Sequence, residues 1–141
     1  MRLALYEPDI PQNAGTLLRM AACLGIDVDI ILPAGFDVSD RRLRRAGLDY
    51  LDHVAITRHE SWVAFEDWRR ARGGAGRVVL LTTKATTGYL DHAYHADDTL
   101  LVGRESAGVP AHVHEAVDAR VRIPMRAGLR SLNVAVAAGI V

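Results

Sequence analysis

Residues 3–32, LALYEPDIPQNAGTLLRMAACLGIDVDIIL, contain two short apolar runs separated by a turn-rich loop and a longer stretch that is compatible with a helix. The runs at 3–6 and 28–32 have the length and the Val, Ile and Leu content of strands that are buried on both faces. The stretch at 14–24 predicts a helix, and Gly25 is a typical residue for ending one. A strand, a helix and a second strand in succession favour a parallel sheet.

The same alternation continues along the rest of the chain. Further strands are predicted at 54–57, 78–82, 100–102 and 121–123, and further helices at 40–46, 61–72 and 110–117, the last with Pro110 at its first position. No linker, repeat or low-complexity tract interrupts the pattern. We therefore expect a single α/β domain over residues 1–141, with an open, mostly parallel sheet and helices on both faces.

The composition narrows the class of protein. The 17 Lys and Arg residues balance the 17 Asp and Glu residues, so a polyanion would have to be held by a local patch rather than by net charge. Cys23 is the single cysteine, which excludes an internal disulfide and a thiolate metal cluster and favours a reducing compartment. No apolar run approaches the roughly 20 residues that span a bilayer. The sequence predicts a cytoplasmic protein without a membrane partner.

Four loops are expected to meet at the carboxyl edge of the predicted sheet, at 7–13, 83–88, 103–110 and 124–133. Ligands of open α/β sheets bind at this edge, because the loops diverge there and helix N-termini direct free N–H groups into the crevice. The four loops are therefore the first place to look for functional residues.

Several common chemistries do not match these loops. The segment that follows the first predicted strand carries only Gly15, whereas a dinucleotide site needs G-x-G-x-x-G, and Lys84 has no glycine loop before it to bind phosphates. Ser106 does not lie in a G-x-S-x-G motif and has no identifiable base, which argues against acyl hydrolysis. The histidine pairs at 92 and 95 and at 112 and 114 lack a metal-site pattern of carboxylates, so no metal is expected.

The final stretch, RSLNVAVAAGIV at 130–141, places polar residues before an apolar helix that is predicted to be buried on every side. Ser131 is a candidate cap for the first turn of this helix. A small polar ligand is the alternative, because Arg130 and Asn133 would also need partners. Asn13, in PQNAG, is likewise a candidate cap for the first helix.

Three segments together resemble a known family: LYEPDIPQNAGTLLRMAACLG, LLVGRESAGVP and RIPMRAGLRSLNVAVAAGIV. Their order and spacing are similar to the three motifs of the SPOUT (SpoU–TrmD) family of S-adenosylmethionine-dependent RNA 2′-O-ribose methyltransferases. The intervening RRLRRAGLDYLDHVAITRHESWVAF and LLTTKAT look like the TrmL type of this family, which methylates the wobble nucleotide of tRNA, position 34. The resemblance covers residues 3–141.

The resemblance implies a sheet whose C-terminal segment is threaded into a trefoil knot, and a homodimer that forms through helices near the knot. S-adenosylmethionine is the implied methyl donor, and the matching donor-binding positions are Leu81, Thr82, Gly103, Ile123, Met125 and Ser131. The matching catalytic positions are Asn13, Arg19, Glu105, Ser131 and Asn133.

Arg19 matches a residue for which a role as general base has been proposed in related enzymes. A guanidinium, with a pKa above ~12, is a poor base at neutral pH. We expect Arg19 to bind the phosphate beside the target ribose and to stabilise the developing negative charge, with Glu105 and Asn13 holding the guanidinium. The best local patch for the RNA backbone is a run of four arginines: Arg41, Arg42, Arg44 and Arg45.

The chain departs from the family pattern in three places. Arg104 stands where relatives commonly carry a smaller or uncharged residue, and Ala135 stands where many have Ser. Relatives also extend the final helix, so we expect the end of that helix to be lacking here. The leading prediction is 2′-O-methylation of the tRNA wobble cytidine or modified uridine. The alternatives are another tRNA or rRNA nucleotide, or a knotted RNA-binding protein without turnover.

Overall fold

The computed structural model describes residues 1–37, 49–71, 73 and 76–141. Its six strands form one sheet in the order β3-β2-β1-β5-β4-β6, and all five pairings of neighbouring strands are parallel. The strands are β1 (Arg2–Tyr6), β2 (Asp27–Ile31), β3 (Ile56–His59), β4 (Val78–Leu81), β5 (Thr99–Val102) and β6 (Ala119–Val121). The predicted open, parallel sheet is confirmed.

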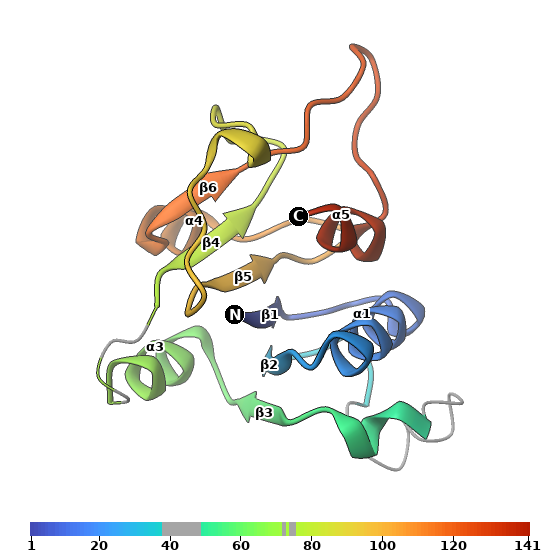
Figure 1. The fold of residues 1–141 in the computed structure, drawn as a ribbon, viewed down its shortest axis with the longest axis vertical. Helices are drawn as coiled ribbons and strands as arrows, with labels where there is room; N and C mark the ends of the chain where they lie inside the picture. Colours follow the sequence, from blue (N-terminus) through green and yellow to red (C-terminus); the bar gives the residue numbers. More distant parts are fainter. Residues whose placement is uncertain (38–48, 72, 74–75) are drawn as a thin grey trace.

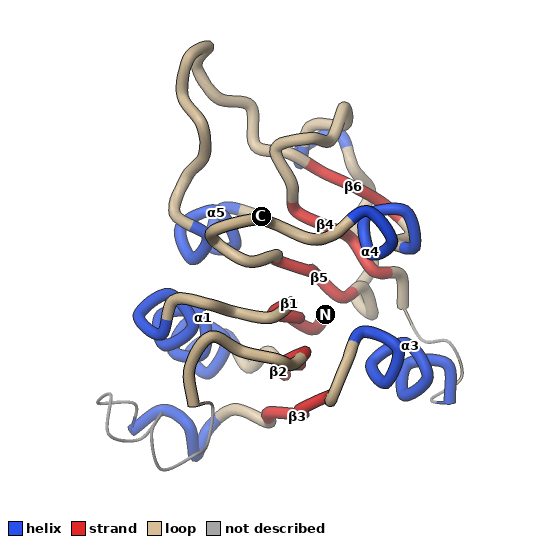
Figure 2. The backbone as a smooth tube through the Cα atoms, turned by 180° about the vertical axis from the view of Figure 1, so that it is seen from behind, coloured by secondary structure: helices blue, strands red, loops and turns tan. Residues whose placement is uncertain are grey.

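Helices cover both faces of the sheet, as predicted (Figure 1 and, from behind, Figure 2). Helices α1 (Pro11–Leu24) and α5 (Val134–Ile140) lie on one face, and α3 (Trp62–Ala71) and α4 (Ala111–Ala116) lie on the other. Two 3₁₀ helices, η1 (Asp49–His53) and η2 (Tyr89–Asp91), lie in the connections. The helix predicted at 40–46 lies outside the described residues.

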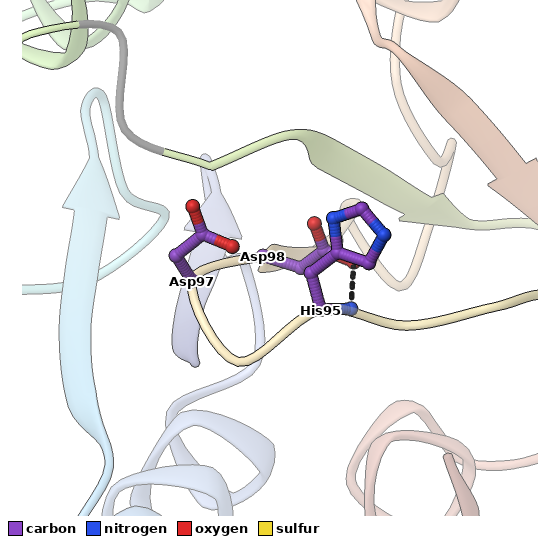
Figure 3. A group of neighbouring side chains, drawn as sticks. All are labelled: His95, Asp97 and Asp98. Carbon is purple, nitrogen blue, oxygen red and sulfur yellow. Dashed lines mark hydrogen bonds between the residues drawn. The ribbon is translucent and has the colours of Figure 1, made fainter.

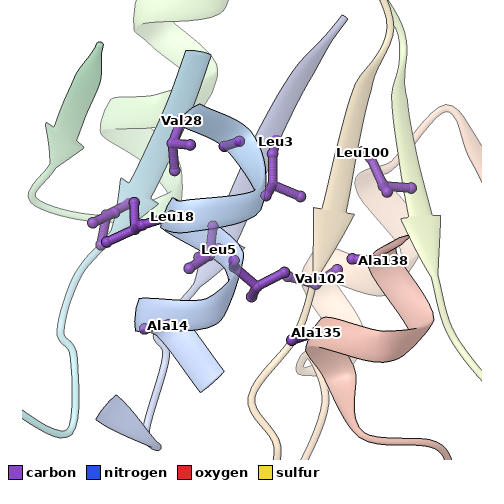
Figure 4. Close-up of a cluster of buried hydrophobic side chains, with 12 residues drawn as sticks. Leu3, Leu5, Ala14, Leu18, Val28, Leu100, Val102, Ala135 and Ala138 are labelled. Atoms are coloured by element: carbon purple, nitrogen blue, oxygen red, sulfur yellow. The ribbon is translucent and has the colours of Figure 1, made fainter. Parts of the chain in front are cut away.

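The core has two layers because successive side chains of a strand point to opposite faces. Leu3 and Leu5 of β1 pack with Val102 of β5 against α1 and α5 (Figure 4). Ala4 and Tyr6, one residue out of phase, pack against α3 and α4 on the other face. The central strand β1 is therefore buried on both sides, as its apolar run predicted.

The strands at the two edges of the sheet lie away from their predicted positions. β3 begins two residues later than predicted, at Ile56, and β6 ends two residues earlier, at Val121. Each has one neighbour, so the register with β2 or β4 decides its limits, and an apolar run does not reveal that register. Helix α4 follows Pro110 instead of containing it.

Helix α1 begins three residues earlier than predicted, because Pro11 occupies its first turn, where a missing N–H costs no hydrogen bond. Asn13 therefore lies inside the helix, and the prediction that it caps the helix is wrong. Gly25 ends the helix in the left-handed conformation (φ 65°), as predicted.

Helix α5 differs from its prediction in two respects. Its cap is Asn133 rather than Ser131: the Asn133 Oδ1 accepts hydrogen bonds from the N–H groups of Ala135 (2.9 Å) and Val136 (3.3 Å). The helix is also not buried on every side, since Ala135 and Ala138 face the core but the Val136 side chain is 54% exposed. An all-apolar sequence shows that a helix can be buried, but not whether its own chain supplies enough neighbours to bury it.

Candidate active site

A cavity of about 510 Å³ opens at the carboxyl ends of β4, β5 and β6. All four loops that the sequence predicted at this edge contribute to its wall: Asn13, the pair Thr83 and Lys84, the run 103–109, and residues between 125 and 133. The order β1-β5-β4 also places the point at which the chain reverses its direction across the sheet between β1 and β5, beside this cavity.

The loop after β5 forms a compact wall of the cavity. Two backbone hydrogen bonds close it, from the Arg104 N–H to the Gly108 carbonyl (3.1 Å) and from the Gly108 N–H to the Arg104 carbonyl (2.8 Å). A Cβ atom at Gly103 would lie 2.7 Å from the carbonyl carbon of Gly108, closer than real Cβ atoms come to backbone. Glycine at 103 is therefore required for the loop to fold back on itself.

The six positions that the family resemblance assigned to donor binding all line this cavity: Leu81, Thr82, Gly103, Ile123, Met125 and Ser131. They come from the ends of three strands and from the segment before α5. The side chains of Leu81, Ile123 and Met125 provide apolar surface, and Thr82 and Ser131 provide hydroxyls. Ser131 is exposed and forms no hydrogen bond among the described residues, so its hydroxyl is available to a ligand.

Four of the five predicted catalytic residues also line the cavity: Asn13, Glu105, Ser131 and Asn133. The Asn133 Nδ2 donates a hydrogen bond to the Asn13 Oδ1 at 2.8 Å and so links the first helix to the last. Burial, followed by the neighbouring Asp9 carboxyl, raises the pKa of Glu105, while a hydrogen bond with Asn13 opposes this shift. A polar chain thus runs from Asn133 through Asn13 to Glu105.

Arg19, the fifth predicted catalytic residue, is not part of the cavity wall. It is exposed on α1, six residues or about 9 Å along the helix from Asn13. Its guanidinium lies 4.7 Å from the centre of the Tyr50 ring, and Nη2 donates to the Tyr50 hydroxyl at 3.3 Å. The expectation that Glu105 and Asn13 hold this guanidinium is wrong for the described residues, because Arg19 has turned towards η1.

Three basic side chains to which the sequence assigned no role at the site also line the cavity: Lys84, Arg104 and His114. Lys84 has no phosphate-binding glycine loop before it, but its place just after a buried strand indicates a position at the carboxyl edge of the sheet. The Arg104 guanidinium forms an ion pair with Glu7. The His114 Nε2 is buried without a hydrogen-bond partner in the described part of the chain.

A second group of polar side chains, His95, Asp97 and Asp98, lies at the turn before β5, at the opposite edge of the sheet (Figure 3). One ligand atom from each falls within 4.8 Å of the others, a grouping that the sequence did not predict. The Asp98 carboxylate, however, accepts hydrogen bonds from Arg77 on both oxygens and from the His95 N–H. These bonds give Asp98 a structural role at the start of β5.

The arginines predicted to bind RNA, at 41, 42, 44 and 45, lie outside the described residues. Arg126 and Arg130, in the loop between β6 and α5, are exposed, and neither forms an ion pair within the described residues. Figure 1 shows this loop projecting from the body of the protein. Within the described ranges, no helix combines the length and the apolar character needed to cross a membrane.

A parallel sheet with a small-molecule cavity at its carboxyl edge defines the class of α/β enzymes that bind a ligand where the strand order reverses. Comparison with known families then identifies the particular family. Residues 1–141 match the model of the SpoU rRNA Methylase family, and the chain belongs to that family.

Relatives with defined names cover nearly the whole chain. A tRNA (cytidine(34)-2′-O)-methyltransferase from Beijerinckia indica is 61% identical over 99% of this chain and 86% of its own length. The Escherichia coli K12 protein of the same name is 40% identical over 100% of this chain and 88% of its own length.

Solved structures agree with these relatives. One that concerns the 2-OH methylation of C/U34 on tRNA is 41% identical and superimposes with a TM-score of 0.88 over 99% of this chain and 89% of its own. The SpoU methyltransferase AviRb from Streptomyces viridochromogenes, solved with the cofactor AdoMet, has a TM-score of 0.88 at 28% identity, over 99% of this chain and 54% of its own.

Proposed function

We propose that this protein transfers a methyl group from S-adenosylmethionine to the ribose 2′-hydroxyl of nucleotide 34 of tRNA, a cytidine or a modified uridine. The observation that carries the proposal is the convergence of residues from all three family motifs on one cavity. The names of the relatives at 61% and 40% identity support the choice of tRNA and of position 34.

The residues around the cavity fit S-adenosylmethionine. The volume of about 510 Å³ is in the range of small-molecule sites, and glycine at 103 lets the cavity wall fold back against Gly108. Leu81, Ile123 and Met125 supply apolar contacts for an adenine, and Ser131 supplies a hydroxyl. The donor supplies a sulfonium methyl that is already activated for displacement. The protein's share of catalysis is therefore mainly positioning and proton management.

The chain's own residues have distinct roles in this proposal. The ribose oxygen would attack the methyl carbon as the carbon–sulfur bond breaks, the donor would leave as a neutral thioether, and the hydroxyl proton would pass to water. Asn13 and Asn133, joined at 2.8 Å, and Glu105 form the polar wall that orients the ribose. Arg19 binds the adjacent phosphate, for which its exposed position on α1 is suited. Arg19 would leave or share its Tyr50 contact to do so.

The RNA backbone is proposed to follow a basic track beside the cavity. Lys84 lies in the cavity wall, and Arg126 and Arg130 each stand next to a cavity-lining residue, Met125 and Ser131 respectively. Three exposed cations without acidic partners among the described residues favour phosphate binding in a protein of zero net charge. The arginines at 41, 42, 44 and 45 are also proposed to bind the RNA backbone.

A homodimer and a C-terminal trefoil knot are part of the proposal, on the basis of the family resemblance. Leu24 at the end of α1, and Val136 and Ile140 on α5, are exposed apolar side chains on neighbouring helices. A second copy of the chain would cover them. The proposed site of action is the cytoplasm, where tRNA is found. The second candidate function is methylation of an rRNA ribose, which the family's description favours.

The test is transfer of a labelled methyl group from S-adenosylmethionine to total tRNA and, in parallel, to total rRNA, followed by mapping of the labelled nucleotide. We expect label at nucleotide 34 of a subset of tRNAs. Label in rRNA alone would favour the second candidate. Calorimetry without measurable donor binding would instead indicate an RNA-binding protein without turnover.

A further inference from the structure

The loop after β1, residues 7–10, and the loop after β5, residues 103–108, are joined by hydrogen bonds that run in both directions. The Asp9 carboxylate accepts from the backbone N–H of Glu105 (3.0 Å) and of Ser106 (3.3 Å), and from the Ser106 hydroxyl. In return, the Asp9 N–H donates to the Glu105 Oε2 at 3.3 Å. We call this set of contacts between Asp9, Glu105 and Ser106 the carboxylate clasp.

Further contacts, made by Glu7 and by Gly35, hold the first loop in place behind the clasp. Glu7, in the left-handed region at φ 43°, donates its N–H to the Ile31 carbonyl at 2.8 Å and pairs its carboxylate with Arg104. On the other side, the Gly35 N–H donates to the Pro8 carbonyl at 2.8 Å, and a Cβ at Gly35 would lie 2.9 Å from the Asp9 Cα. Asp9 therefore has little room to withdraw from the second loop.

Asp9 itself does not line the cavity, whereas Glu105 and Ser106 do. Its carboxylate reaches the cavity wall from behind, through the backbone N–H groups of the wall. We propose that Asp9 is a positioning residue, which fixes the backbone at Glu105 and Ser106 and thereby sets the direction of the Glu105 side chain and the shape of the donor cavity. The functional part of this inference rests on the proposed methyl transfer.

The charges of the two carboxyl groups suit this arrangement. The hydrogen bond with the Glu105 carboxyl, together with those from Ser106, lowers the pKa of Asp9 to about 2. Burial and the nearby Asp9 carboxyl raise the pKa of Glu105. Asp9 is therefore ionised at neutral pH when it accepts from the N–H groups of Glu105 and Ser106, and charge-assisted hydrogen bonds of this kind are stronger than neutral ones.

The inference is tested with Asp9→Ala, Asp9→Asn and Ser106→Ala. Asp67→Asn is the control, since Asp67 is 68% exposed on α3. Amide hydrogen exchange at Glu105 and Ser106 and the NMR titration of the Glu105 carboxyl are measured on the unliganded protein, so they do not depend on the proposed function. Binding of S-adenosylmethionine is measured by calorimetry. Asp9→Asn keeps one acceptor oxygen, and Ser106→Ala keeps the whole carboxylate, so both provide a reading if Asp9→Ala does not fold.

We expect exchange at Glu105 and Ser106 to accelerate, and the donor Kd to rise, by about tenfold in Asp9→Ala, with smaller changes in Asp9→Asn and Ser106→Ala. In Asp9→Asn the like charge near Glu105 is gone, so its titration should move to lower pH, which a merely structural role would not cause. Unchanged exchange and an unchanged Glu105 titration in folded Asp9 variants would overturn the inference. If amide exchange is faster in an Asp9 variant but the variant binds S-adenosylmethionine with the wild-type Kd, the proposed effect of Asp9 on the donor cavity is overturned. A wild-type protein that binds no donor would instead contradict the proposed function.

Discussion

Arg19 shows how far a single residue's role depends on its neighbours. Its position in the sequence indicated a catalytic guanidinium, yet in the structure it stacks on Tyr50 at 4.7 Å and lies outside the cavity wall. A planar guanidinium can stack on a ring and donate to a phosphate at the same time, which an ammonium group cannot do. The contact with Tyr50 therefore suits a guanidinium that is held ready for RNA.

The Arg19→Lys substitution should lower kcat by about 100-fold on saturating tRNA, because lysine keeps the charge but loses the fork that binds phosphate and stabilises the developing oxyanion. Initial rates of methyl transfer provide the measurement. Arg70→Lys is the matched control, since Arg70 is exposed on α3 and pairs only with acidic residues of its own helix among its described ion pairs. Near-native turnover by Arg19→Lys would contradict both roles for Arg19, as the general base and as the guanidinium that binds phosphate.

Asp98 makes a pH-dependent contribution to stability. Burial tends to raise its pKa, but hydrogen bonds from Arg77 and from the His95 N–H outweigh burial and lower the pKa to about 2. Because the folded-state pKa lies below that of the unfolded chain, the stabilisation is complete above about pH 4 and is lost as the pH falls through about 2.

Asp98→Asn should lower the free energy of unfolding at pH 7 by about 2 kcal/mol, since charge-assisted hydrogen bonds to Arg77 are lost. Urea unfolding at pH 7 and at pH 3 measures this difference, and the gap between variant and wild type should narrow at the lower pH. The exposed Asp67→Asn serves again as the control. An equal gap at both pH values would show that the ionised form of Asp98 is not what stabilises the fold.

At the scale of the element, the conformation of the loop after β5 requires that residue 103 has no side chain. A methyl group at Gly103 would collide with the backbone of Gly108, and backbone cannot turn aside as a flexible side chain can. Gly103→Ala should therefore displace the cavity wall and lower kcat/KM for methyl transfer by about 100-fold, the effect of misplacing reactants by about 1 Å.

The matched control for this loop is Gly139→Ala on α5, where the nearest atom to the new methyl is the flexible Met20 Sδ at 3.3 Å. We expect that variant to keep donor affinity close to wild type, as measured by calorimetry. If Gly103→Ala matched Gly139→Ala in donor affinity and in kcat/KM, the close approach of Gly103 to Gly108 would not matter for methyl transfer.

At the scale of the whole molecule, the exposed apolar side chains Leu24 on α1 and Val136 and Ile140 on α5 form the surface that we propose a second copy of the chain covers. Val136→Asp should raise the dissociation constant of the proposed dimer by at least about 100-fold, because an unpaired charge would be buried in an apolar interface. Sedimentation over a concentration series measures this constant. Val63→Asp on α3, where valine is 64% exposed, is the control and should leave assembly unchanged. A wild-type protein that sediments as a monomer at all concentrations would contradict the dimer.

Much of the fold could be predicted because the interior strands β1, β2, β4 and β5 are buried on both faces and carry continuous apolar runs. The edge strands were misplaced, since their limits depend on register with one neighbour. The interior was not entirely apolar either. Asp29, inside a predicted buried strand, is fully buried, and its carboxylate accepts a hydrogen bond from Arg2 and bonds to His59, residues that are distant in the sequence.

By itself, the sequence determined the α/β class, the two-sided sheet, the family and the four loops that contribute to the cavity wall, because each of these depends on local pattern or on motifs in a set order. Only the tertiary structure decided which contacts the polar residues at and near the cavity make. Asn133 rather than Ser131 caps α5, Arg19 faces Tyr50, and Asp9 binds the far side of the wall. The last two outcomes depend on contacts between residues 31 and 96 positions apart in the sequence, and no spacing within one segment records the partner that a polar group will find there.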